Sequence, residues 1–125
     1  MKSRWLSVMI LGLALGVGLL VISCKKSTSP GGGTPADITI GITGINGANS
    51  YFPNPDTVKV GQTVAWHNAA GATHTATSLT AGIFDTGHVS PGATSGAIRM
   101  NTAGSFPYQC SIHGSLMTGT LVVNP

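Results

Sequence analysis

The stretch VKVGQTVAWHN, residues 58–68, carries the clearest structural pattern in the chain. On each side of Gly61, apolar side chains occupy every second position, first two valines and then Val64 and Trp66. Because the side chains of a β-strand point alternately to opposite faces of a sheet, this period of two predicts two strands joined by a tight turn. Trp66 is expected to point into the core.

The chain from Asp37 onward continues in the same way. Gly and Pro interrupt it about every 8–12 residues, the intervals are rich in Thr, Val and Ile, and no helical periodicity is sustained. In the segment before Cys110, Phe106 and Tyr108 fall on the same face as the cysteine. We expect strands near residues 37–43, 51–52, 57–60, 62–68, 73–79, 94–101, 104–110 and 118–123. Seven or eight short strands in about 90 residues predict an all-β fold, a β-sandwich.

Residues 1–23 have the organisation of an export signal. Two positive charges up to Arg4 precede an apolar run without charge that ends at Ile22. The run is also just long enough to span a bilayer as an uncleaved anchor. However, VISC (residues 21–24) resembles a bacterial lipobox at the point where the run stops, and this favours a lipoprotein signal peptide. The resemblance implies that Cys24 carries a diacylglyceryl group and becomes the mature N-terminus.

The expected anchor defines the remaining organisation. Residues 24–36 comprise the lipidated cysteine and a flexible linker of Ser, Gly and Pro, and residues 37–125 form the folded domain. We expect an exported protein that is lipid-anchored in the bacterial cell envelope, on the periplasmic side. Because Lys25 follows the cysteine, the outer membrane is favoured in a Gram-negative host. A disulfide between Cys24 and Cys110 is the alternative for an oxidising compartment, but Cys110 lies in a motif that uses a thiolate.

Charged residues are scarce, and this excludes several functions. They make up 7% of the chain, and there are only three carboxylates, all Asp. Within residues 37–125 only Lys59 and Arg99 are basic, so the net charge of +3 comes from the leader and the linker. The domain has no basic face for nucleic acid. It also lacks the paired carboxylates of a typical glycoside hydrolase.

Four side chains that bind soft metals gather in the second half of the domain. Cys110 and His113 are three positions apart, Met117 follows four positions later, and His74 lies at the start of an expected strand. Two imidazoles, a thiolate and a thioether are the ligands of a blue copper site, in which His2Cys forms a trigonal plane and Met is a weak axial ligand. The sequence therefore predicts one type 1 copper ion, bound by loops at one end of the sandwich.

With these motifs the chain resembles the cupredoxins, specifically the plastocyanin/amicyanin-like group. The shared patterns are V-x-V-G-x-x-V-x-W-x-N at 58–68, N-x5-H at 68–74, F-D-[ST]-G at 84–87, G-x-[YF]-x-[YF]-x-C at 104–110 and M-x-G at 117–119. The resemblance implies a Greek-key β-sandwich and a copper ion held by His74, Cys110, His113 and Met117. It also implies that Asn68 and the backbone N–H of Thr75 brace the ligand loops and hydrogen-bond the sulfur. One departure concerns Met117. Three residues separate it from His113, where plastocyanins have four and amicyanins two.

The expected function is that of an electron carrier between redox partners outside the cytoplasmic membrane. Donor and acceptor would dock near His113, the ligand that lies at the surface in the family, among small and uncharged residues. The alternative is a copper binding, buffering or delivery protein without an electron-transfer role. We do not expect an enzyme, because copper enzymes of related fold need more histidines than the four present here, often in H-x-H pairs that this chain lacks. We expect a monomer, with His67 and His88 outside the site.

Overall fold

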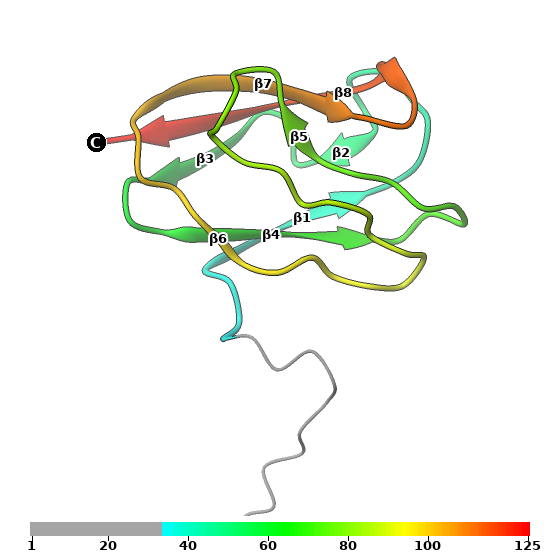
Figure 1. Ribbon diagram of the computed structural model, residues 1–125, viewed down its shortest axis with the longest axis horizontal. Coiled ribbons are helices and arrows are strands. Elements are labelled where there is room, and N and C mark those ends of the chain that lie inside the picture. Colours follow the sequence, from blue (N-terminus) through cyan, green and yellow to red (C-terminus); the bar gives the residue numbers. More distant parts are fainter. Residues whose placement is uncertain (1–33) are drawn as a thin grey trace, which may run out of the picture.

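The chain folds as a sandwich of two four-stranded sheets (Figure 1). The computed structural model describes residues 34–125, so the expected signal peptide, Cys24 and most of the expected linker lie outside the described residues. The strands are β1 (Ile38–Ile42), β2 (Tyr51–Phe52), β3 (Asp56–Lys59), β4 (Thr63–Asn68), β5 (Thr77–Ser78), β6 (Ile98–Arg99), β7 (Gly104–Cys110) and β8 (Gly114–Asn124). Within residues 34–125 no helix has the length and apolarity needed to cross a membrane. The predicted all-β sandwich of seven or eight strands is confirmed.

Both sheets mix parallel and antiparallel pairs. One sheet has the order β2-β1-β4-β6 and the other β3-β8-β7-β5. The pairs β1–β4 and β3–β8 are parallel, whereas the remaining pairs are antiparallel. The chain therefore crosses between the sheets several times before it closes with the β7–β8 hairpin. Residues 111–113 form the loop of this hairpin at one end of the sandwich.

Residues 58–68, the VKVGQTVAWHN stretch, form the end of β3, a turn and β4. Val58, Val64 and Trp66 are buried, and Gly61 occupies the turn with a φ of 93°, a backbone conformation that favours glycine. Val60 departs from the expected alternation. It follows the end of β3 and is 43% exposed.

Three strands differ from their predicted lengths by more than two residues. The segment predicted as 73–79 is a strand only at Thr77–Ser78, because residues 74–76 bond to the loop at 86–89 instead of to a sheet. The segment predicted as 94–101 is a strand only at Ile98–Arg99, since a serine hydroxyl, Ser95 Oγ, accepts the N–H of Trp66 where a ladder would use a carbonyl. By contrast, the last strand is longer than predicted and begins directly after the hairpin loop.

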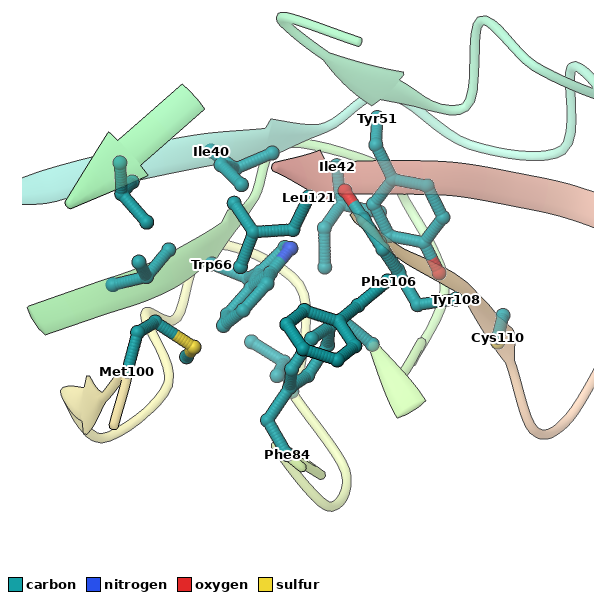
Figure 2. Close-up of a cluster of buried hydrophobic side chains, with 14 of the residues drawn as sticks. Ile40, Ile42, Tyr51, Trp66, Phe84, Met100, Phe106, Tyr108, Cys110 and Leu121 are labelled. Atoms are coloured by element: carbon teal, nitrogen blue, oxygen red, sulfur yellow. The ribbon is translucent and has the colours of Figure 1, made fainter. Parts of the chain in front are cut away.

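Aromatic side chains fill the centre between the sheets (Figure 2). The ring of Tyr108 lies edge-on to Tyr51, Trp66 and Phe84, with centroid distances of 4.7, 5.8 and 5.5 Å. Tyr108 also lies opposite Gly119 on β8. A Cβ atom on Gly119 would lie 2.6 Å from the Tyr108 hydroxyl oxygen. The glycine of the M-x-G pattern therefore leaves room for a core tyrosine.

Candidate metal centre

Two separate segments deliver the predicted ligands to one end of the sandwich. Cys110 ends β7, where the register with β8 shifts, and His113 lies in the loop that follows. The His74 segment is held in place by a pair of backbone hydrogen bonds with Val89, of 3.2 and 2.8 Å. As a result, residues 36 positions apart in sequence face one another.

The side chains of His74, Cys110 and His113 meet with their donor atoms together. The two Nδ1 atoms lie 3.2 Å apart, and Cys110 Sγ lies 3.4 Å from His113 Nδ1 and 3.9 Å from His74 Nδ1. The centre of such a triangle is about 2 Å from each corner, which is the length of a bond from imidazole nitrogen or thiolate sulfur to a first-row metal ion. The three atoms therefore fit one small metal ion between them.

Burial differs among the three residues. Cys110 is completely buried and His74 is 1% exposed, whereas His113 is half-buried. Burial, together with the charge of His113 beside it, lowers the pKa of His74 below its ordinary value. A lowered pKa keeps the His74 nitrogen unprotonated, which is the form that binds a metal.

Thr75 lies directly behind the cysteine sulfur. Its backbone N–H donates to Cys110 Sγ at 3.4 Å. That Thr75 braces the metal centre stays a prediction. The Thr75 hydroxyl oxygen accepts the N–H of Ser111 at 2.7 Å, and the Thr75 carbonyl accepts the hydroxyl of Tyr51. Sequence reasoning missed these last two contacts. No sequence signal marked them, because one donor is a backbone N–H that any residue but proline would supply and the other comes from a tyrosine 24 positions away.

Asn68 ties together the segments on either side of His74. Its side-chain amide is completely buried and donates to the carbonyls of Ala72 and Val89 at 2.7 and 2.8 Å, while its oxygen accepts the N–H of Ala70 at 2.9 Å. These bonds fix the start and the end of the loop that leads to His74. That Asn68 braces the site stays a prediction, with a geometry that suits it.

The remaining histidines and Met117 have different surroundings. Met117 is completely buried near the start of β8, and its backbone is bridged to Gly47. Its role as axial ligand stays a prediction. His67 lies on β4, where its Nδ1 is 2.9 Å from the Thr94 hydroxyl, and His88 is exposed. Neither of these two histidines belongs to the cluster of donor atoms.

Sequence comparison identifies the family. Over 103 residues the chain is 31% identical to plastocyanin from Scenedesmus fuscus, in a match that covers 70% of this chain and 99% of the plastocyanin. The chain belongs to the cupredoxin family. No protein-family model matches the sequence.

Solved structures agree with this assignment to the cupredoxins. The purple cupredoxin from Nitrosopumilus maritimus matches with a TM-score of 0.61 at 25% identity, and the match covers 70% of this chain and 100% of the purple cupredoxin. A mutant of amicyanin in its Cu(I) form has a TM-score of 0.60 at 25% identity, covering 74% of this chain and 86% of the amicyanin. In this cupredoxin the donor set of one sulfur and two imidazole nitrogens fits one type 1 copper ion, the cofactor that the sequence predicted.

Proposed function

We propose that this cupredoxin carries single electrons between redox partners at one type 1 copper ion. The observation that carries the proposal is the meeting of His74, Cys110 and His113 donor atoms within 3.9 Å of one another. When bound, copper supplies a one-electron couple between Cu(II) and Cu(I). Under the same proposal Met117 is the weak axial ligand.

The chain's own residues suit this role because they hold their positions. His74 and Cys110 belong to segments that are tied by the Val89, Asn68 and Thr75 hydrogen bonds. These two ligands are therefore kept in one place before and after an electron arrives, and the complete burial of Cys110 excludes water from the sulfur. His113 alone among the three reaches the surface, so the shortest route for an electron to a partner leads through its imidazole.

An apolar, uncharged surface surrounds His113, and we propose that donor and acceptor dock there. Ile112 and Leu116 are exposed beside it, and Ile45 is exposed on a loop that bonds to the start of β8 through Gly47 N–H and Leu116 O. A shallow open hollow of about 530 Å³ extends from Ile45 over small residues to His74. Small apolar patches suit transient partners, and the absence of charge predicts association that depends weakly on salt.

We also propose that the protein is exported as a monomer and held at the membrane by lipid on Cys24. The support is the apolar leader that ends in VISC and the following linker of residues 25–36. Mass spectrometry of the membrane-bound protein tests this point. We expect a mature N-terminus at Cys24 with the added lipid mass, and an unmodified Cys24 in that fraction would contradict the anchor.

The copper proposal is tested by the visible spectrum of the purified protein after addition of Cu(II). We expect intense orange-red absorption that is lost in Cys110→Ser, although the variant still folds as judged by circular dichroism. His74→Ala should also lose or alter the absorption. The matched control is His88→Ala, because His88 is exposed and outside the cluster, and it should leave the spectrum unchanged.

The alternative, copper buffering or delivery, predicts a different result. It requires bound copper that is colourless or exchanges readily, with no reversible redox couple in voltammetry. That outcome would refute the electron-carrier proposal while leaving copper binding itself intact. A protein that binds no copper would refute both.

A further inference from the structure

A line of hydroxyl groups runs from the surface to the back of the metal centre. At its outer end the carboxylate of Asp85 is exposed and accepts the hydroxyl of Thr77 at 3.0 Å. Thr77 Oγ1 lies 3.1 Å from Thr75 Oγ1, which in turn accepts the backbone N–H of Ser111 at 2.7 Å. The line thus joins an exposed acidic residue to Thr75, which is 1% exposed.

The inner end of this line acts on the cysteine sulfur through Thr75. Every polar atom of Thr75 is engaged. Its N–H donates to Cys110 Sγ, its carbonyl accepts from Tyr51, and its hydroxyl bonds to the residue after the cysteine. A shift of the Thr75 side chain therefore moves both the N–H behind the sulfur and the start of the loop that carries His113.

The carboxylate of Asp85 determines which hydroxyl groups act as donors along this line. A hydroxyl has one hydrogen and a carboxylate has none to donate, so the hydrogen of Thr77 goes to Asp85 and leaves its lone pairs for Thr75. The hydrogen of Thr75 then lies between two acceptors, Ser111 Oγ at 3.0 Å and Thr77 Oγ1 at 3.1 Å. Asp85 itself is fixed by the backbone N–H of Gly87 at 2.9 Å. Hydrogen bonds to a charged oxygen are stronger than neutral ones, and this favours the anchored arrangement.

The rest of the F-D-T-G pattern holds the same segment by other contacts. Thr86 accepts the N–H of Ala76 on its side-chain oxygen at 2.8 Å and donates its own N–H to the Ala76 carbonyl at 3.1 Å. The Thr77 side chain is not needed for those backbone contacts. The hydroxyl line is therefore an addition to the turn, and the two can be separated by substitution.

We propose that Asp85 and Thr77 are positioning residues of the metal centre, which hold Thr75 so that its N–H stays directed at Cys110 Sγ. This inference rests on the proposed function only for its electrochemical consequence. An N–H donor takes electron density from a thiolate and so favours the reduced state of the site. Loss of the line should weaken that bond and lower the reduction potential.

The experiment compares Thr77→Val, Thr77→Ser and Asp85→Ala. The first removes the linking hydroxyl at nearly constant volume, the second restores it, and the third removes the outer anchor. Thr57→Val is the matched control, because Thr57 is an exposed threonine on a strand of the same sheet and its hydroxyl is not part of the line. Amide hydrogen exchange of the copper-free protein is measured by NMR, and the reduction potential of the copper-loaded protein by voltammetry.

In the copper-free protein we expect Thr77→Val and Asp85→Ala to speed exchange at the amides of Thr75 and Ser111. The increase should reach about tenfold, the limit set by the net contribution of one hydrogen bond. Amides in β4 should be unaffected, and Thr77→Ser should match the unsubstituted protein. In the copper-loaded protein, Thr77→Val and Asp85→Ala should lower the reduction potential. Thr77→Ser and Thr57→Val should leave it near the value of the unsubstituted protein.

Two results would overturn the proposal. Exchange that rises equally throughout the β-strands would mean that Thr77 and Asp85 only stabilise the fold. Exchange that stays unchanged at Thr75 and Ser111 would mean that the line does not position them. Because this measurement needs no copper, neither result depends on whether the protein carries electrons.

Discussion

Replacing Gly119 with alanine tests how tightly the Tyr108 ring is locked against β8. Gly119 lies directly opposite Tyr108, and its new methyl group would lie 2.6 Å from the tyrosine hydroxyl oxygen and closer still to the ring. The ring has little room to retreat, because the buried rings of Tyr51 and Trp66 pack against it. The φ angle of Gly119 is not in the left-handed region, so the cost is steric and not conformational.

The expected loss of stability for Gly119→Ala follows from this packing. Overfilling a packed core costs about 1–3 kcal/mol, and a ring held by aromatic neighbours should place the cost in the upper half of that range. Alanine also restricts the unfolded chain, which returns about 0.4–1 kcal/mol. The net loss is about 2 kcal/mol, equivalent to a fall in Tm of about 8–16 °C for a domain of this size.

Denaturant and thermal unfolding of the copper-free protein measure this loss. Gly41→Ala is the control, because its methyl group would meet only the Phe52 carbonyl oxygen at an ordinary 3.5 Å, and its stability should be unchanged or slightly raised. In a Tyr108→Leu background, Gly119→Ala should cost clearly less than it does alone. If Gly119→Ala behaves like Gly41→Ala, or if the Tyr108→Leu background makes no difference, the steric reasoning is wrong.

Three further predictions concern single side chains. Hydrogen bonds from the Thr63 backbone N–H and hydroxyl lower the pKa of Asp37 below its ordinary value. These bonds therefore stabilise the fold above the ordinary pKa of an aspartate, and this stabilisation is lost as the pH falls through the lowered pKa of Asp37. Asp37→Asn should flatten the acid limb of stability against pH in urea unfolding, and an unchanged limb would contradict this. Met117→Leu should keep the colour and raise the potential, whereas Met117→Gln should lower it. Equal small shifts in one direction would show that Met117 only packs. Asn68→Ala removes three side-chain hydrogen bonds, each with a net contribution of about 0.5–1.5 kcal/mol, and should cost about 2–4 kcal/mol in chemical unfolding, with a loss under about 1 kcal/mol as the contrary result.

The sequence predicted most of the fold because its information is local. Alternation of apolar residues marked β3, β4 and β7, and the buried faces at Val64, Trp66 and Tyr108 follow it. β5 and β6, which were predicted too long, lie at the edges of their sheets. There, hydrogen bonds to side chains and loops replace the backbone hydrogen bonds between strands. Alternation cannot reveal this, because it records which face is buried and not which partner a backbone group finds.

The candidate ligands were predictable for a different reason. Thiolate and imidazole donors are rare and chemically specific, so Cys110, His113 and His74 stand out by residue type and spacing. The residues behind them do not. Thr77 and Asp85 are ordinary polar residues, and their link to Thr75 depends on where a loop eight residues away folds back. Only the structure brings them together.

The strand pairing also sets the order in which the metal centre can assemble during folding. β7 and β8 form a hairpin with a short loop, so Cys110 and His113 can approach each other through local contacts alone. The parallel pairs β1–β4 and β3–β8 close much longer loops, which is entropically costly and slow. The His74 segment leads into β5, whose antiparallel pairing with β7 joins Thr77 to Gln109 and also closes a long loop, so His74 reaches the hairpin only after that pairing. We therefore expect Cys110 and His113 to come together early in folding, before His74 joins them. Copper that is added before folding is complete would then find two of these three ligands.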